Sequence, residues 1–273
     1  MHTSVFLNEA VDALDVQEGK KYIDATFGEG GHARLIQSRG GIVLGIDADK
    51  VQATKEKELT VVNGNYGDIK TIAEANHFVP AAGILFDFGL SMVQLKTGGK
   101  GLSYRNDEEI LDMRLGQEGE PAYEYLNAAS YEELAEMITR YSEDLSSERI
   151  ARRIVTYRSK KPIQTVGDLK NVINEATRLQ GASREKTYAR IFQAVRIIVN
   201  DELTQIQKGL EGAYDILDAK GKIVIISFHS VEDRLVKAFV RSKGLKHQRI
   251  SVQKSRKLQT FERSATLRVI EKI

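Results

Sequence analysis

The stretch from Tyr22 to Asp47 constrains the fold of this chain more than any other. A short apolar segment leads into a glycine-rich turn and a helix-length segment, and a second apolar run then ends on Asp47. Strand, turn, helix and strand in this order predict a βαβ unit of a parallel sheet. Gly28, Gly30 and Gly31 lack the Cβ atoms that would keep a ligand away from the backbone of the turn.

The acids beside this turn indicate which ligand it would hold. Asp47 stands where a carboxylate can accept hydrogen bonds from ribose hydroxyls, which predicts a nucleoside-containing cofactor. The spacing Gly28-x-Gly30-x-x-Ala33 satisfies the dinucleotide fingerprint of nicotinamide enzymes. Asp24, four residues before the turn, favours S-adenosylmethionine instead. Its carboxylate would repel a pyrophosphate but would attract a sulfonium or an ammonium group.

The composition is that of an ordinary globular protein without covalent cross-links. Of the 273 residues, 41% are hydrophobic and 29% are charged, and the absence of cysteine excludes disulfides and thiolate metal sites. His2, His32, His77 and His247 do not form a metal-binding set with their neighbours, and no metal is expected. No apolar run approaches the roughly 18 residues of a membrane span. Ordered-looking sequence begins almost at Met1, which predicts no signal peptide and a cytoplasmic location.

The chain alternates between strand-forming and helix-forming stretches. Apolar, β-branched runs occupy 22–25, 42–46, 60–62, 83–88, 222–228 and 266–270. The first four are separated by helix-length segments, so we expect a Rossmann-like α/β fold with a doubly wound, mostly parallel sheet. After Phe88 the strand rhythm stops for more than a hundred residues, which predicts an inserted all-helical domain. The expected boundaries are 1–101 for the first part of the core, 102–200 for the insert and 201–273 for the second part.

Helix signals fill the predicted insert. Ser130-Tyr-Glu-Glu133 is a capping box that opens a helix to about residue 141, and Thr165-Val-Gly-Asp168 is a second box-like start. Residues 143–160 have helical periodicity, and a long helical pattern runs from about 186 to 217. This last pattern predicts one continuous helix that leads back to the sheet.

Charge is distributed unevenly along a chain whose net charge is only +2. Residues 107–148 hold 13 acidic and 2 basic residues, whereas 146–161 hold six Arg or Lys against one acid. Residues 234–263 hold ten Arg or Lys against one acid. Either basic stretch alone can be a solvated face. Two of them together favour a surface that binds a polyanion, and nucleic acid is the natural candidate.

Asp87 ends the fourth strand-forming run and is the leading catalytic candidate. Ligands of doubly wound sheets bind outside the carboxyl ends of the strands, so Asp87 and Asp47 should face one crevice. Hydrogen bonds from an exocyclic amine to a carboxylate would make that amine more nucleophilic toward an in-line methyl group. Asp87 as a simple turn cap is the competing interpretation.

The segment from Ile226 to Arg234 is a second chemical cluster, at another strand end. His229 is a candidate for contact with the substrate, and Ser230 with Asp233 is expected to cap the following helix. Asn200-Asp-Glu202 is expected to hold the insert against the core by polar contacts, although its spacing is equally compatible with catalysis.

Seven motifs in this order resemble the bacterial 16S rRNA cytosine-N4 methyltransferase family over essentially the whole chain. They are Asp24-Ala-Thr-Phe-Gly-Glu-Gly-Gly-His32, Gly45-Ile-Asp-Ala-Asp49, Leu85-Phe-Asp-Phe-Gly-Leu90, Leu111-Asp-Met-Arg114, Phe192-Gln-Ala-Val-Arg-Ile-Ile-Val-Asn-Asp-Glu202, Ile226-Ser-Phe-His-Ser-Val-Glu-Asp-Arg234 and Arg263-Ser-Ala-Thr-Leu-Arg268. The resemblance implies S-adenosylmethionine as methyl donor, and N4 of a cytidine in the decoding centre of the small ribosomal subunit as acceptor. It also implies a Rossmann-like methyltransferase core.

Position by position, the resemblance carries over a set of site residues. Asp87 and His229 are the catalytic candidates, and the donor-binding residues would be Gly30, Gly31, His32, Asp47, Tyr66, Asp87 and Gln94. Tyr66 stands where the family usually has phenylalanine and still offers an aromatic face to adenine.

The chain departs from the family pattern mainly in segments expected to face the acceptor. Ser91-Met-Val-Gln-Leu-Lys96, Lys100-Gly-Leu-Ser-Tyr104, the segment 107–116 and Glu185-Lys-Thr-Tyr-Ala-Arg190 all differ from the usual sequence. A shifted RNA target and a non-catalytic role in ribosome assembly are therefore alternatives, with a nicotinamide oxidoreductase as a distant third. The expected partner is 16S rRNA within the small subunit, with no membrane, and a dimer is possible.

Overall fold

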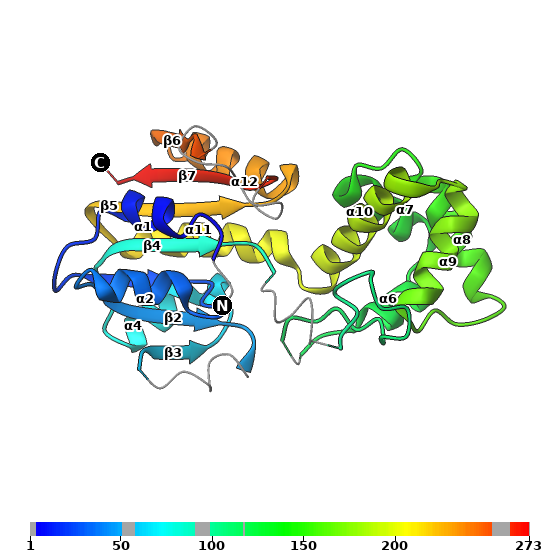
Figure 1. Cartoon of the computed structure of the whole chain (residues 1–273), viewed down its shortest axis with the longest axis horizontal. Coiled ribbons are helices and arrows are strands. Elements are labelled where there is room, and N and C mark those ends of the chain that lie inside the picture. Colours follow the sequence, from blue (N-terminus) through cyan, green and yellow to red (C-terminus); the bar gives the residue numbers. More distant parts are fainter. Residues whose placement is uncertain (1–3, 51–57, 91–98, 117, 253–262, 273) are drawn as a thin grey trace. The chain divides into compact units, whose positions relative to one another are not determined.

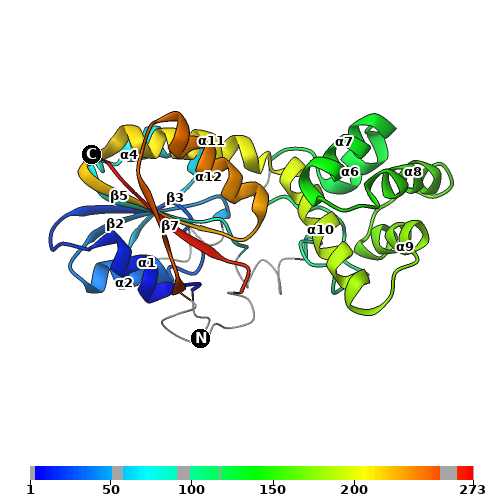
Figure 2. The same ribbon diagram turned by 90° about the horizontal axis from the view of Figure 1, so that it is seen from above.

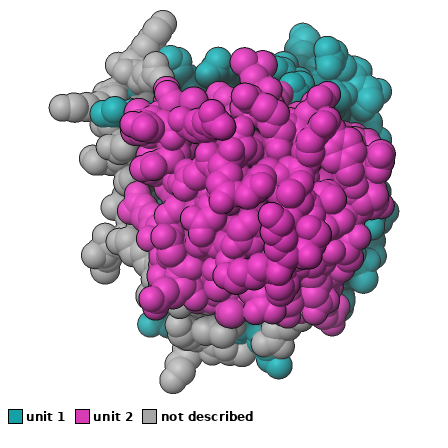
Figure 3. Space-filling model, turned by 90° about the vertical axis from the view of Figure 1, so that its right-hand side faces the viewer, with its two compact units in different colours: residues 1–91, 203–273 teal, residues 92–202 magenta. Residues whose placement is uncertain are grey.

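The computed structural model describes residues 4–50, 58–90, 99–116, 118–252 and 263–272. The chain divides into two compact units, coloured teal and magenta in Figure 3. Residues 1–91 and 203–273 form the first, and residues 92–202 form the second. The domain boundaries expected from the sequence, at 101/102 and 200/201, remain a prediction.

The first unit contains one seven-stranded sheet. Its strands are β1 (Lys21–Asp24), β2 (Ile42–Asp47), β3 (Thr60–Asn63), β4 (Ala81–Asp87), β5 (Leu217–Ser227), β6 (His247–Ile250) and β7 (Thr266–Glu271). Their order is β3-β2-β1-β4-β5-β7-β6, in which the first five run parallel and β7 runs antiparallel to both β5 and β6. The expected Rossmann-like, mostly parallel sheet is confirmed. The edge strand β6 was not predicted.

Helices cover both faces of this sheet. Helices α1 (Leu7–Leu14) and α2 (Gly31–Ser38) lie on one face, and α4 (Ile69–Ala75), α11 (Glu202–Ile216) and α12 (Ser230–Ser242) lie on the other, as Figures 1 and 2 show. Alternate residues of a strand point to opposite faces, so Tyr22 packs with α1 and α2 while its neighbour Ile23 packs with α4 and α11. Burial on both sides explains the nearly continuous apolar runs.

The second unit is helical. It contains α6 (Ala122–Ala128), α7 (Tyr131–Ser142), α8 (Ser147–Arg158), α9 (Val166–Thr177) and α10 (Gly181–Val199). Both predicted capping boxes are confirmed: Ser130 with Glu133 begins α7, and Thr165 with Asp168 begins α9. In each box the side chain of the N-cap residue accepts a hydrogen bond from the backbone N–H of the third helical residue. The carboxylate of that third residue in turn accepts the backbone N–H of the N-cap residue.

The long helix expected over residues 186–217 is instead two helices, α10 and α11. The break falls at Asn200 and Asp201, where Asp201 adopts a left-handed φ of 46°. The side-chain amide of Asn200 donates to the carbonyl of Met113, and its Oδ1 accepts the N–H of Leu115, at 2.9 and 2.8 Å. Apolar periodicity continues through this point, so the pattern alone does not reveal the break.

The sheet order creates one position where the chain reverses direction across the sheet. Strand β1 lies between β2 and β4, and each of these three strands ends on an aspartate: Asp24, Asp47 and Asp87. Because parallel strands end at the same edge, the fold collects three carboxyl groups at the crevice where such sheets bind their ligands.

Candidate active site

Asp24 is the most deeply buried of the three strand-end acids. It has no exposed surface, and its Oδ2 has no hydrogen-bond partner among the described residues. Burial raises its pKa to about 7, and the charge of Asp47 adds to this. The backbone N–H groups of Thr26 and Ala33 act in the opposite direction. An unpaired buried carboxyl oxygen is costly, so this atom is suited to a proton or to a positively charged ligand.

Asp87 lies beside Asp24 on the neighbouring strand. Burial raises its pKa to about 7; the N–H of Gly89 opposes the shift, and the charges of Asp24 and Glu232 reinforce it. The backbone N–H of Asp87 donates to Oγ1 of Thr26 at 2.6 Å, which ties the end of β4 to the turn after β1. The geometry therefore brings Asp87 and Asp24 together at one point of the sheet edge.

Asp47 joins the glycine turn to the end of β2. Its Oδ2 accepts the N–H of Gly28 and its Oδ1 accepts the N–H of Asp49, both at 2.7 Å. Burial raises its pKa to about 6, although both of these hydrogen bonds favour the ionised form. One hydrogen bond to each oxygen is given by the described residues, and a carboxylate oxygen has two lone pairs. The expected role of Asp47 as an acceptor for ribose hydroxyls remains a prediction.

These three acids share an electrostatic property. Among the described residues, no lysine or arginine contributes to the pKa of Asp24, Asp47 or Asp87, and their mutual repulsion raises the pKa of both Asp24 and Asp87. Like charges held together away from water favour a proton or a cation between them. The edge of the sheet is thus prepared for a ligand that carries positive charge.

The glycines of the turn make room for the protein's own side chains. A Cβ on Gly30 would lie 2.6 Å from the ring of Phe27, and so would a Cβ on Gly45 of β2. A Cβ on Gly31 would collide with the hydroxyl of Ser4. Gly30 also has a φ of 73°, which favours glycine. At Gly30 and Gly31, the missing Cβ therefore clears space for Phe27 and Ser4, which differs from the sequence argument that it clears a path for the ligand.

His32 is buried in the first turn of α2. Its Nε2 lies 3.0 Å from the carbonyl of Val5, and burial lowers its pKa to about 4. The imidazole is therefore neutral, with its Nε2 proton donated to Val5. The ring packs against the N-terminal segment. The predicted contact of His32 with the methyl donor would therefore involve its backbone atoms, and it remains a prediction.

Tyr66 belongs to a group of aromatic rings near the ends of the strands. It lies in a 3-10 turn (η1, Tyr66–Asp68), with ring centroids 6.0 Å from Phe86 and 5.8 Å from Phe88. The ring thus lies on the same unit as the three acids, and its adenine-binding role remains a prediction. Gln94, the last expected donor-binding residue, lies outside the described residues.

The cap of α12 differs from the prediction. His229, not Ser230, is the N-cap, and Glu232, not Asp233, completes the capping box. Nδ1 of His229 lies 3.4 Å from the N–H of Glu232, and Nε2 lies 2.8 Å from Oε1 of Glu232. The sequence argument expected a serine cap because serine is the commoner residue there. The contact of His229 with substrate remains a prediction.

Asp233 has a structural partner instead. Its two carboxylate oxygens accept the guanidinium of Arg268 on β7, at 2.6 and 3.1 Å, and Lys237 lies 3.1 Å away. Burial alone would raise the pKa of Asp233, but these cations lower it. The motifs that end on Arg234 and Arg268 therefore meet in a paired contact that joins α12 to β7.

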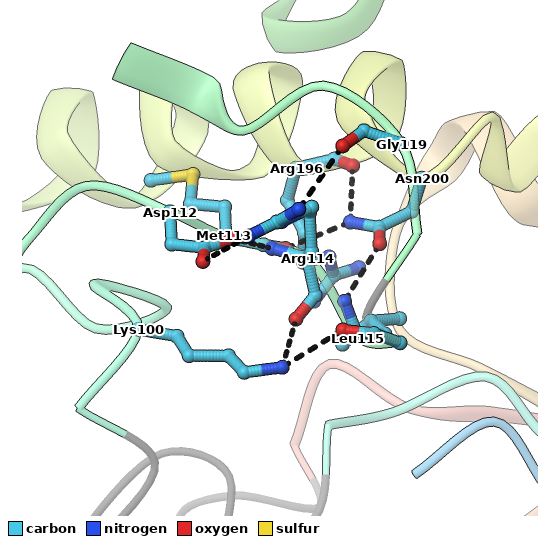
Figure 4. Close-up of polar contacts among 9 residues, drawn as sticks. Lys100, Asp112, Met113, Arg114, Leu115, Gly119, Arg196 and Asn200 are labelled. Atoms are coloured by element: carbon cyan, nitrogen blue, oxygen red, sulfur yellow. Dashed lines mark hydrogen bonds and ion pairs between the residues drawn. The ribbon is translucent and has the colours of Figure 1, made fainter. Parts of the chain in front are cut away.

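Polar contacts hold the loop before α6 in the second unit (Figure 4). The Lys100 ammonium donates to the carbonyls of Arg114 and Gly116, both at 2.9 Å, and Arg114 binds the carboxylate of Asp112. Asn200 fastens the same loop to the end of α10. The bonds of Asn200 with residues 113–115 lie within this unit, so they organise the insert itself; its expected contact with the core remains a prediction.

Much of the basic stretch 146–161 is engaged inside the second unit. Arg153 pairs with Glu175 and Lys161 with Asp168, while Arg158 donates to the carbonyl of Leu126. These contacts weaken the argument that this stretch is an RNA-binding surface. In the second stretch, Lys237 pairs with Asp233 and Lys243 with Glu211. Three of its ten basic residues, Lys254, Arg256 and Lys257, lie outside the described residues.

Comparison with known proteins places the chain in a family. The model of the MraW methylase family matches residues 1–273. The chain is 39% identical to the Ribosomal RNA small subunit methyltransferase H of Deinococcus deserti, over all of this chain and 94% of that protein. It is 42% identical to the protein of the same name from Deinococcus radiodurans, over 88% of this chain and 78% of that one.

The chain belongs to the MraW methylase family. The protein of Thermomicrobium roseum with the same name is 41% identical over 88% of this chain and 77% of its own length. The resemblance inferred from the motifs is confirmed, and a methyl donor is the cofactor in keeping with a methylase. No helix of the described residues is both long and apolar enough to cross a membrane.

Proposed function

We propose that this MraW methylase transfers a methyl group from S-adenosylmethionine to N4 of a cytidine in the decoding region of 16S rRNA. The single observation that carries the chemistry is the set of three carboxyl groups at the ends of β1, β2 and β4, whose pKa values are all raised by burial in the part of the chain that the structure describes. The relatives named above supply the rRNA of the small subunit as substrate class. The departures in the acceptor-side segments leave the target base as the part that most needs a test.

The residues present fit the methyl donor. Oδ2 of Asp24 is buried and unpaired, and the pKa values of all three acids are raised, so the site gains from a ligand that brings positive charge. S-adenosylmethionine carries two such groups, a sulfonium and an ammonium, and when bound it would supply an electrophilic methyl. Asp47 would accept ribose hydroxyls, and Tyr66 would offer a ring face to adenine. A pyrophosphate would meet three carboxylates in the same place, which disfavours a nicotinamide cofactor.

Asp87 would act on the acceptor. The lone pair of an exocyclic amine is delocalised into the base, and an N–H bond to a carboxylate returns electron density to the nitrogen. When the new N–C bond forms, the C–S bond breaks, its electron pair stays on sulfur, and the nitrogen must lose one proton. A carboxyl whose pKa is about 7 can take that proton near neutrality. Asp87 would therefore serve both as hydrogen-bond acceptor and as the base that receives the released proton.

Nucleoside analysis of methylated rRNA tests this function. Purified protein and isotope-labelled S-adenosylmethionine would be incubated with small subunits, and separately with free 16S rRNA, both from a strain that lacks N4-methylcytidine. We expect label in N4-methylcytidine from the decoding region. Calorimetry with S-adenosylmethionine and with NAD, on the protein alone, would identify the cofactor independently.

Different outcomes distinguish the alternatives. Label in another nucleoside would mean a shifted RNA target. Donor binding without label in either RNA would favour a role in ribosome assembly without catalysis. Binding of NAD in place of S-adenosylmethionine would overturn the proposal altogether.

A further inference from the structure

Glu232 is a buried acid whose charge the capping of α12 does not require. Its exposed fraction is 1%, and it is the third residue of the helix. Its Oε2 accepts the N–H of Phe228 at 2.7 Å and the N–H of His229 at 3.3 Å. Its Oε1 lies 2.8 Å from Nε2 of His229 and has no further hydrogen-bond partner among the described residues.

A neutral glutamine would cap the helix equally well. Capping boxes use Glu or Gln at this position, and a carboxylate withdrawn from water is more costly than an amide. The other two boxes avoid that cost: Glu133 is exposed, and the buried Asp168 binds Lys161 at 2.8 Å. Among the described residues, the ion-pair partner of Glu232 is a histidine instead of a lysine or arginine. The charge of Glu232 therefore requires another explanation.

Glu232 is connected to Asp87 through a short series of contacts. It holds the N–H of Phe228, and the ring of Phe228 occupies the space of the missing Cβ of Gly89, where a Cβ would lie 2.5 Å from the ring. The N–H of Gly89 in turn donates to Oδ1 of Asp87 at 3.2 Å. The N–H of Phe88 donates to the carbonyl of Ile226 at 3.0 Å, which fixes the ends of β4 and β5 against each other.

We propose that Glu232 is a positioning residue of the methyl-transfer site, which locks the Phe228–His229 turn against Asp87–Gly89 and places a negative charge beside Asp87. The inference rests on the proposed function of Asp87. The groups that face Asp87 are Asp24 from β1 and Glu232 from α12, and both charges raise the pKa of Asp87 beyond the effect of burial. Glu232 thereby keeps Asp87 able to receive the amine proton near neutral pH.

The first experiment follows the titration of Asp87 without any ligand. Carboxyl-carbon NMR of labelled aspartates, with the Asp87 signal assigned by its loss in Asp87→Asn, would give its pKa in the wild type and in Glu232→Gln. The amide oxygen of Gln can still accept the two backbone N–H groups, so the turn is kept while the charge is removed. We expect the pKa of Asp87 to fall by about one unit.

Asp233→Asn is the matched control, since it removes a charge from the same turn of α12. The charges that act on the pKa of Asp87 are those of Asp24 and Glu232, whereas Asp233 pairs with Arg268 and Lys237, so this variant should leave the titration of Asp87 unchanged. An unchanged Asp87 titration in a folded Glu232→Gln protein would overturn the inference. Equal shifts in the two variants would overturn it as well, because the effect would then belong to the helix and not to Glu232.

The second experiment measures single-turnover methylation against pH. Loss of the Glu232 charge should move the acid limb of the rate profile to lower pH by the same roughly one unit. Glu232→Asp keeps the charge on a shorter side chain; it should leave the acid limb in place and lower the plateau rate about tenfold, because the turn loosens. If Glu232→Gln does not fold, a Glu232→Asp plateau equal to that of the wild type overturns the inference.

The two experiments separate this inference from the proposed function. A wild-type protein that methylates no rRNA, but whose Asp87 titration depends on Glu232, would refute the function and support the electrostatic role. A wild-type protein that methylates rRNA with a pH profile identical to that of Glu232→Gln would support the function and refute the role of Glu232.

Discussion

The three strand-end aspartates of the first unit and Asp168 of the second unit experience opposite environments. In the first unit, burial raises the pKa values of Asp24, Asp47 and Asp87, and repulsion from a neighbouring strand-end acid adds to the effect at Asp24 and Asp87. In the second, burial would also raise the pKa of Asp168, but Lys161, Tyr157 and backbone N–H groups outweigh it and hold the pKa well below the usual range. Asp168 is fully hydrogen-bonded and stabilises the insert, whereas the strand-end aspartates have raised pKa values and are suited to binding a positively charged ligand.

Asp87→Asn should show the largest effect of all, on chemistry. The amide keeps the shape of the side chain but removes a charged acceptor and can present a donor to the amine. We expect single-turnover methyl transfer to fall roughly 100–1000-fold at saturating donor. Asp215→Asn, at an exposed site paired with Lys70, is the control and should keep the wild-type rate. A wild-type rate in Asp87→Asn would reduce Asp87 to a cofactor-binding or capping residue and make His229 the leading candidate.

Asp168→Ala should show the largest effect on stability and none on donor affinity. The substitution leaves the hydroxyl of Tyr157 and the N–H groups of Gln164 and Thr165 without their acceptor. We expect the free energy of unfolding at pH 7 to fall by about 2–3 kcal/mol. Because the folded pKa of Asp168 is depressed, its contribution is present at pH 7 and is lost only as the pH falls below the ordinary aspartate range. Urea unfolding followed by circular dichroism measures the free energy of unfolding and its dependence on pH. A variant as stable as the wild type at pH 7 would contradict the contrast between the units.

Asp47→Ala should weaken the donor without weakening the fold. Ribose hydroxyls left without their acceptor should reduce the affinity for S-adenosylmethionine by roughly 1–3 kcal/mol in a calorimetric titration. Asp12→Ala, which removes an exposed carboxylate paired with Arg39, should leave that affinity unchanged. Equal affinities in wild type and Asp47→Ala would remove Asp47 from the binding site.

Asp24→Asn should give the smallest change in stability, and it should stabilise the protein at alkaline pH instead of destabilising it. The pKa of Asp24 is raised to about 7 in the folded protein, so the folded state holds its proton more tightly than the unfolded state does. Stability at this site is greatest below pH 4 and is lost as the pH rises toward 7. A neutral amide removes that loss but buries an NH2 group without an acceptor among the described residues, and this cost offsets most of the gain. The variant should therefore be more stable than wild type by only about 1 kcal/mol at pH 8, with the gain shrinking toward pH 4. Melting curves across that range would disprove the idea if the variant were less stable at pH 8.

Sequence patterns predicted the parts of the fold that depend on local chemistry. The strand runs and both capping boxes of the insert were found because continuous apolar runs and side-chain caps leave a signature in adjacent residues. The strand-end acids were expected to meet for the same reason, since strand ends of a parallel sheet share an edge. Strand β6 was missed because His247–Ile250 is mostly exposed and carries no apolar alternation.

What the sequence did not predict depends on partners far away in the chain. The break between α10 and α11 is fixed by Asn200 and the loop at 113–115, some 85 residues earlier. His32 matched the expected motif, but its ring bonds to Val5, a contact that no spacing reveals. The importance of Glu232 was hidden because its effect on Asp87 requires β4 and β5 to lie side by side.

The ring of Phe27 has a consequence for how sequences of this family can change. It occupies the space left by two missing Cβ atoms, at Gly30 and at Gly45. A smaller residue at position 27 would remove the tightest contact of a Cβ at Gly45 and leave a Val61 methyl at 3.1 Å, which a small shift of that side chain can relieve, whereas Gly30 would still be restricted by its positive φ. Positions 27 and 45 should therefore vary together among relatives, and position 30 should stay fixed whatever happens at the other two.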